Sequence, residues 1–178
     1  MCDLHHIGGR RRGSSFAVSG TNQTRKAETI AVGAEEREMK ADQVGALCVR
    51  HRDNGACQVL LITSRDTGRW IIPKGWRAKR MKDHEAAARE AAEEAGVSGK
   101  VKSKPIGNYS YAKTGDSGTR SVRVAVFLLL VRRESNRWPE QRERRRAWFD
   151  VRKAVEEVGE RQLRKLIKGV ERLSAAAL

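Results

Sequence analysis

The sequence is poor in cysteine and in aromatic residues, and it has no long apolar run. Cys2, Cys48 and Cys57 form no CxxC pair, so neither a disulfide framework nor a cysteine-rich zinc site is expected. No apolar stretch approaches the roughly 20 residues that span a bilayer, and no secretory signal is visible. With nine aromatic residues in 178, the core must rely on aliphatic side chains. These absences favour a reduced, cytoplasmic protein.

Basic residues, by contrast, are abundant. The chain has 37 Lys and Arg against 22 Asp and Glu, a net charge of +15. Residues 1–41 hold seven basic and five acidic residues, so a net of +13 belongs to the remainder. Such a surface favours a polyanion: nucleic acid, an anionic membrane or a highly phosphorylated small molecule. Charge alone does not choose among these partners.

The length suits one domain with its own core. Residues 1–41 show no sustained periodicity and contain Gly, Ser, Thr and charges, which predicts a disordered or loosely ordered tail. A natural start near Met39 is an alternative. Residues 42–178 are predicted to form the domain.

Hydrophobic patterns in the domain predict an α/β fold. Alternating or continuous apolar stretches predict strands over 43–50, 58–65, 70–72, 101–114, 119–133 and 145–151. A helix is predicted over 83–95. An amphipathic C-terminal helix follows Asp150 and packs on the core through Leu163, Leu166, Ile167, Val170 and Leu173. In outline the order is β-β-β-α-β-β-α, which favours helices covering a mixed sheet.

The most informative segment is 75–97, GWRAKRMKDHEAAAREAAEEAGV. It places Glu90, Glu93 and Glu94 within five residues. At 3.6 residues per turn, Glu90 and Glu94 project within about 40° of each other on a helix. Acidic runs on helices are most often solvated surface. Three carboxylates this close nevertheless repel one another unless a divalent cation or a bound cationic group neutralises them.

The flanking residues delimit this helix. Upstream, the apolar stretch WII is stopped by Pro73, and Gly75 predicts a turn. Asp83 is a candidate N-cap. Gly96, followed by apolar Val97, is typical of a left-handed helix end. The predicted unit is therefore a strand, a loop, a short acidic helix and a tight stop.

This spacing resembles the Nudix box, G-x5-E-x7-R-E-U-x-E-E-x-G-U, where U is aliphatic. The matching positions are Gly75, Arg89, Glu90, Glu93, Glu94, Gly96 and Val97. Ala91 fills the first aliphatic position, and Met81 stands where the pattern has its first glutamate. The resemblance covers about residues 42–172 and implies a Nudix-type α/β/α sandwich with a mixed central sheet.

Nudix enzymes cleave a diphosphate linkage by attack of water on phosphorus with Mg²⁺ or Mn²⁺. Glu90 and Glu94 share one helical face and are the best candidate metal ligands, and the resemblance adds the backbone carbonyl of Lys74. Glu93 is implied as the base or a further ligand. Arg89 is implied to fix a glutamate by a bidentate pair, with Gly75 and Gly96 as structural positions.

Cations near the box suggest how a substrate is held. Taken singly, each is more often a plain surface charge, but together they predict a cradle for several phosphates. The candidate substrate-binding residues are Arg65, Arg69, Lys74, Lys79, Arg80, Lys82, Lys113 and Arg120.

Two segments narrow the substrate. TSRDTGRWIIPKGW and QRERRRAWFDVRKAV are similar to the diphosphoinositol polyphosphate phosphohydrolase group and its bacterial relatives, which also act on dinucleoside polyphosphates. Relatives of this group often lack the first box glutamate. The triplet PKG is also similar to dinucleoside tetraphosphate hydrolases.

The sequence therefore predicts a metal-dependent pyrophosphohydrolase acting on a dinucleoside polyphosphate or a diphosphoinositol polyphosphate. An RNA 5′-end pyrophosphohydrolase is an alternative that uses both the catalysis and the charge. A non-catalytic RNA- or nucleotide-binding module is another; the net charge and Met81 favour it. The intact glutamates and the few aromatics suited to base stacking disfavour it. Nucleic acid is thus a possible partner, a membrane is not expected, and the oligomeric state is left open.

Overall fold

The computed structural model describes residues 40–115 and 118–175. Except for residues 40 and 41, the predicted tail 1–41 lies outside them. The described residues form one eight-stranded mixed sheet. Its strands are β1 (Gln43–His51), β2 (Cys57–Thr63), β3 (Trp70–Ile71), β4 (Lys74–Trp76), β5 (Val97–Val101), β6 (Gly107–Gly115), β7 (Gly118–Glu134) and β8 (Arg146–Asp150).

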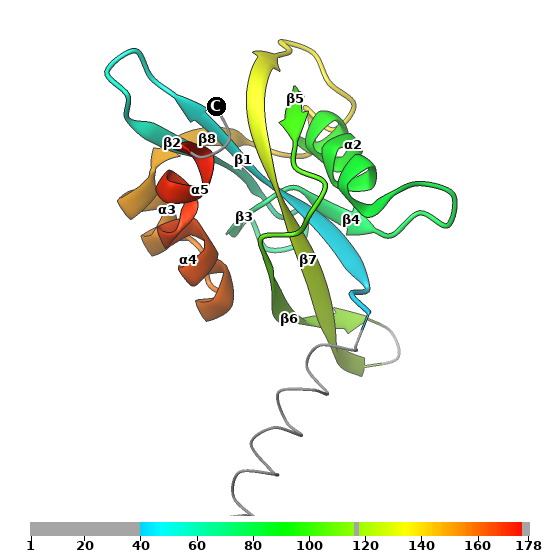
Figure 1. Cartoon of the computed structure of the whole chain (residues 1–178). Helices are drawn as coiled ribbons and strands as arrows, with labels where there is room; N and C mark the ends of the chain where they lie inside the picture. The colour runs from blue at the N-terminus through cyan, green and yellow to red at the C-terminus, as the bar shows by residue number, and fades with distance from the viewer. Residues whose placement is uncertain (1–39, 116–117, 176–178) are drawn as a thin grey trace, which may run out of the picture. The chain divides into compact units, whose positions relative to one another are not determined.

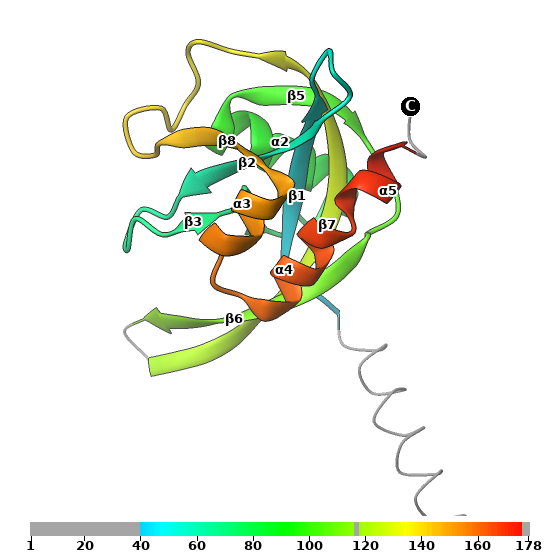
Figure 2. The same ribbon diagram turned by 90° about the vertical axis from the view of Figure 1, so that its left-hand side faces the viewer.

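Helices cover both faces of this sheet. On one face lies α2 (Asp83–Ala95), and on the other lie α3 (Val151–Glu157), α4 (Arg161–Lys168) and α5 (Val170–Ala175) (Figures 1 and 2). The predicted α/β class with a mixed central sheet is confirmed. None of the helices in the described ranges is both long and apolar enough to cross a bilayer.

The two central strands, β1 and β7, run parallel, and every other pairing is antiparallel. Each central strand changes partner midway. β1 pairs with β4 over residues 43–45 and with β2 over residues 49–51. β7 pairs with β6 over residues 118–126 and with β5 over residues 129–134. As a result, β4 and β6 both flank the end of the sheet where β1 begins.

Strand β1 is buried on both sides because its side chains alternate between two cores. Val44, Ala46 and Cys48 join the core under α2, together with the small residues Ala86, Ala87, Ala91 and Ala95. Leu47 and Val49 point the other way, into a core that includes Leu163, Ile167 and Val170. Alanines on α2 let this helix approach the sheet closely, which brings its glutamates to the sheet end near β4.

Several predicted elements differ in detail. The stretch around Gly75 is a short strand instead of a turn, because β4 pairs with the start of β1. The predicted strand 101–114 begins at the last residue of the unpredicted β5, which pairs with the far half of β7, and resumes only at Gly107 as β6. The predicted C-terminal helix is likewise three helices, with Gly169 as the C-cap of α4.

The helices correct two further predictions, one about a helix end and one about the core. The N-cap of α2 is Lys82, because the Asp83 carboxylate is paired with the Arg77 guanidinium at 2.8 Å. Gly96 ends the helix in the left-handed conformation, with φ of 64°, as predicted. Leu173 is 40% exposed, so it does not belong to the core stripe formed by the other predicted residues of this helix.

Candidate active site

Glu90 lies against the backbone of β4, and Gly75 makes this approach possible. A Cβ atom at Gly75 would overlap the Glu90 carboxyl group. The Glu90 side chain is only 12% exposed, and its Oε1 accepts a hydrogen bond of 3.1 Å from Arg89 Nη2. The glycine and the glutamate of the sequence motif, 15 residues apart in the chain, are therefore in direct contact.

Glu94 is buried one turn further along the same helix face. The backbone amide of Lys74 donates a 2.9 Å hydrogen bond to its Oε2, and Arg144 pairs with its Oε1. Burial raises the pKa of Glu94 to about 7, while the Lys74 amide and the Arg144 guanidinium act in the opposite direction. This carboxyl group is thus tied to the strand that carries Gly75.

Arg144, which sequence reasoning missed, is buried beside the helix. Besides Glu94, it contacts Glu140 through Nε at 2.6 Å and donates to the carbonyl oxygen of Thr63 at 3.1 Å. Its side chain is only 6% exposed. The run RERRRAW contains this residue, but no local pattern separates its one fully buried arginine from the other three.

Glu93 and Arg89 lie on the more open side of α2. The Glu93 side chain is 46% exposed, and Arg89 Nε lies 3.6 Å from its Oε1. Arg89 therefore makes one contact with Glu90 and one with Glu93. The predicted bidentate pair with a single glutamate is not formed. Glu93 is absent from the described residues that line the adjacent cavity.

A cavity of about 570 Å³ opens beside Glu90 and Glu94, between β4, β6 and the segment after β2. Four of the predicted substrate-binding cations line it: Arg65, Arg69, Lys74 and Lys113. Burial lowers the pKa of Lys74, and the Glu94 carboxylate acts in the opposite direction. Three unpredicted carboxylates, Asp66, Glu140 and Glu160, also line the cavity. Glu140 contacts Arg144, and Glu160 has an Oε2 atom buried with no hydrogen-bond donor among the described residues.

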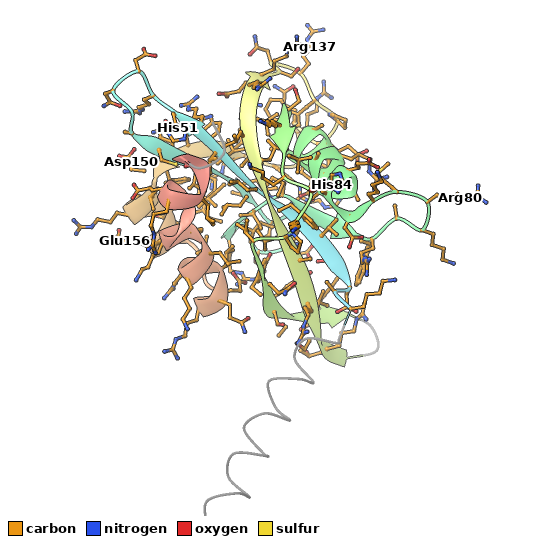
Figure 3. All side chains as sticks on the ribbon, in the orientation of Figure 1. His51, Arg80, His84, Arg137, Asp150 and Glu156 are labelled. Carbon is orange, nitrogen blue, oxygen red and sulfur yellow. The ribbon has the colours of Figure 1, made fainter. Side chains whose placement is uncertain are left out.

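The other four predicted cations lie outside the cavity lining. Lys79, Arg80 and Lys82 are exposed on the loop between β4 and α2. Figure 3 shows Arg80 at the outer end of this loop, pointing into solvent. Arg120 also misses the lining, but its guanidinium lies 5.0 Å from the ring centroid of Trp76, which does line the cavity.

The donors at this site suit a hard divalent cation. Mg²⁺ prefers carboxylate and carbonyl oxygens, and here two carboxylates converge on the backbone of residues 74 and 75. Any Cβ at residue 75 would occupy the space that the Glu90 carboxyl group fills, so the close approach of Glu90 to the backbone depends on a glycine at this position. The described residues contain no ready group of three or more His, Cys, Asp or Glu ligands, so a bound ion would also need backbone, water or substrate oxygens.

Comparison with known proteins agrees with this geometry. A model of the NUDIX domain matches residues 41–170. The chain belongs to the Nudix family. The resemblance predicted from residues 75–97 is thereby confirmed.

Curated Nudix relatives come from plants and mammals. The chain is 32% identical to Nudix hydrolase 12, mitochondrial, from Arabidopsis thaliana, over 67% of this chain and 61% of the relative. It is 34% identical to diphosphoinositol polyphosphate phosphohydrolase 3-beta from Bos taurus, over 62% of this chain and 65% of the relative. The chain thus spans less than two thirds of the length of these relatives. Because plant relatives carry mitochondrial names, the cytoplasmic location stays a prediction.

Solved structures share the Nudix fold at low sequence identity. The C. elegans Ap4A hydrolase in a binary complex has a TM-score of 0.57 at 18% identity, over 77% of this chain and 99% of that one. The NUDIX domain of Shewanella oneidensis NrtR complexed with ADP ribose has a TM-score of 0.55 at 15% identity, over 83% of this chain and 98% of that one. These likenesses establish the fold.

Proposed function

We propose that this Nudix protein is a metal-dependent pyrophosphohydrolase that cleaves a phosphoanhydride bond in a polyphosphorylated small molecule. The observation that carries the proposal is one cavity that is lined both by Glu90 and Glu94 and by several cations. Carboxylates without nearby cations would repel phosphates, and cations alone would bind without holding a metal. A Nudix relative named for diphosphoinositol polyphosphates and a structural neighbour named for Ap4A support a dinucleoside polyphosphate or a diphosphoinositol polyphosphate as the substrate.

Glu90, Glu94 and the backbone carbonyl of Lys74 would hold Mg²⁺ or Mn²⁺. When bound, such an ion neutralises charge on phosphoryl oxygens and favours ionisation of water. Among the side chains of the protein, Arg65, Arg69, Lys74 and Lys113 would bind the phosphates and orient the polyphosphate of the substrate. Glu93 would accept the proton of the attacking water, and Arg89 would keep Glu90 and Glu93 in position.

Met81, the departure from the Nudix box, lies away from this chemistry. Its side chain is 37% exposed on the loop between β4 and α2 and is absent from the cavity lining. A glutamate missing at this position therefore leaves the cavity carboxylates in place. This supports an active enzyme over an inactive descendant.

A second candidate, an RNA 5′-end pyrophosphohydrolase, is favoured by one observation. Lys79, Arg80 and Lys82 are exposed on the loop between β4 and α2 and do not line the cavity, so a small substrate held in the cavity would not need them. A longer polyanion that leaves the cavity across this loop would use them. A binding module without catalysis would share this surface.

A substrate panel separates these functions. Diadenosine polyphosphates, diphosphoinositol polyphosphates and 5′-triphosphorylated RNA would be incubated with Mg²⁺, Mn²⁺ or EDTA, and the products resolved by ³¹P NMR. In ¹⁸O-labelled water, the isotope shift identifies the phosphorus that is attacked. We expect metal-dependent cleavage of a small polyphosphate. RNA binding that weakens steeply with salt, without cleavage of any compound, would instead establish the binding module.

Replacing Glu93 with glutamine is expected to lower kcat by about a hundred-fold, the lower end of general-base effects, because this side chain is half exposed. Mg²⁺ affinity should change little, since the Glu90 and Glu94 carboxylates remain. Steady-state kinetics and calorimetric metal titration check the two parts. Glu140→Gln and Glu160→Gln are the comparison variants, because both carboxylates line the cavity. If either loses more kcat than Glu93→Gln, the base is assigned wrongly.

Gly75→Ala is expected to weaken Mg²⁺ binding by about ten- to hundred-fold, in the range of changes that misplace a metal ligand. The added methyl group would overlap the Glu90 carboxyl group and push it from the backbone of β4. Gly115→Ala is the matched control, because a Cβ there meets no atom within 4 Å. Calorimetric titration with Mg²⁺ measures the difference; equal affinities for the two variants would contradict the proposed ligand position.

A further inference from the structure

Three of the nine aromatic residues of the chain line the cavity. Both tyrosines of the sequence, Tyr109 and Tyr111, line it, as does Trp76, one of four tryptophans. Tyr109 is buried, and Lys74 Nζ lies 5.0 Å from the ring centroid of Tyr111. Trp76, in contrast, is 43% exposed, which is unusual for so large an apolar group. Among the described residues, it is the exposed aromatic ring of this cavity.

The ring of Trp76 is contacted by cations. Lys113 Nζ lies 5.2 Å from its centroid, and Arg120 Cζ lies 5.0 Å from it. Lys113 and Arg120 face each other directly across the β6–β7 pair. Like charges at such positions repel, and cation–π contacts at exposed sites are weak. The two cations are therefore available to an incoming anion, and their departure toward phosphates would uncover the ring.

The backbone beneath the ring is firmly placed. Trp76 pairs with Gln43 in the β4–β1 ladder, and the Tyr111 hydroxyl donates a 2.9 Å hydrogen bond to the Gln43 side-chain oxygen. Gly75, the neighbour of Trp76, touches Glu90. The indole is thus held one residue from the proposed metal site, with its position linked to three strands.

We propose that Trp76 is the stacking platform for a nucleobase of the substrate, while Lys113 and Arg120 bind the adjoining phosphates. This rests on the proposed function and selects within it: the substrate is a nucleoside joined to a polyphosphate chain, rather than an inositol pyrophosphate. A nucleobase offers a flat π face to the indole. An inositol ring surrounded by phosphates offers none and would set charged, hydrated groups against an apolar surface. One of the few aromatic residues of the sequence is therefore exposed at the cavity, where base stacking needs it.

The same chemistry could come from a dinucleoside polyphosphate or from the 5′ end of an RNA. The two sources differ in what lies beyond the stacked nucleoside. In RNA, further phosphates would continue toward the exposed Lys79, Arg80 and Lys82. In a dinucleoside polyphosphate, the polyphosphate chain ends in a second nucleoside, and these three cations contribute little.

The test compares Trp76→Ala and Trp76→Phe with the wild-type protein. The probes are diadenosine tetraphosphate, a 5′-triphosphorylated oligonucleotide and base-free inorganic tetraphosphate. Dissociation constants are measured by calorimetry in EDTA, and kcat/KM is measured with Mg²⁺. Leu173→Ala is the matched control, because it removes another exposed apolar side chain far along the sequence, outside the cavity lining. Circular dichroism confirms that each variant is folded.

We expect Trp76→Ala to weaken binding of the nucleoside probes by about ten- to hundred-fold more than binding of tetraphosphate. Trp76→Phe should recover most of this loss, and Leu173→Ala should leave both unchanged. If Lys79→Ala weakens binding of the oligonucleotide but not of diadenosine tetraphosphate, the stacked nucleoside belongs to the 5′ end of an RNA. Equal losses for all three probes would overturn stacking while leaving the hydrolase intact. Trp76-dependent binding without any hydrolysis would instead overturn the proposed function and keep the platform.

Discussion

Glu94→Gln is expected to lower kcat/KM by about a thousand-fold, which corresponds to several kcal/mol of metal-derived stabilisation of the transition state. The substitution keeps the size of the side chain but removes the negative charge that a divalent ion requires. It also leaves Arg144 with one carboxylate partner, Glu140, in place of two. Because the amide oxygen can still accept from Lys74, the backbone of β4 should stay where it is.

The pH dependence of Mg²⁺ affinity distinguishes this loss from a general disturbance. Burial raises the pKa of Glu94 to about 7, so below that pH a proton competes with the metal for this carboxyl group. Mg²⁺ affinity of the wild-type protein should therefore rise between pH 6 and pH 8, and in Glu94→Gln this rise should flatten. Glu156→Gln makes the same chemical change on α3, where the side chain points away from the sheet (Figure 3), and should behave like wild type. A fully active Glu94→Gln enzyme would contradict the assignment of Glu94 as a metal ligand.

The sequence predicted that Glu90 and Glu94 share one helix face, because this arrangement is local. Residues 75–97 place their glutamates by helical spacing alone, and Gly96 ends the helix where the pattern predicts. Gly75 also matched the motif, although the reason is tertiary: only the fold shows that Glu90 would collide with a side chain there. The glycine of the motif therefore reflects a tertiary contact, which the sequence pattern alone does not reveal.

The basic half of the site was predicted less completely, because sequence proximity is a poor guide to which cations share a cavity. Lys79, Arg80 and Lys82 lie within residues 75–97, yet none of the three lines the cavity. Lys113 comes from the β6–β7 hairpin and lines it. Strand β4 was not predicted, for a related reason, although the short strands β3 and β8 were. β4 contains a glycine and only three residues, and its extended form depends on pairing with β1.

Arg144→Leu is expected to destabilise the folded protein by about 3–5 kcal/mol at pH 8, the usual effect of removing one partner from a buried ion pair. Glu94 would lose its guanidinium partner while remaining buried, and the carbonyl of Thr63 would lose a donor. Arg142 supplies the matched control. It is exposed and makes no hydrogen bond or ion pair within the described part of the chain, so Arg142→Leu should change stability by less than about 0.5 kcal/mol. Urea denaturation measures both variants.

The pH dependence of the Arg144→Leu effect tests the physical cause. Without the guanidinium, the pKa of the buried Glu94 carboxyl should rise further above its unfolded value. A group of this kind contributes stability that is lost as pH rises through its folded pKa. The destabilisation should therefore be smaller at pH 5 than at pH 8. Adding Glu94→Gln to Arg144→Leu should also recover part of the loss at pH 8, because no unpaired charge is then buried. Additive losses in the double variant would mean that Arg144 stabilises the fold through packing and the Thr63 carbonyl, independently of Glu94.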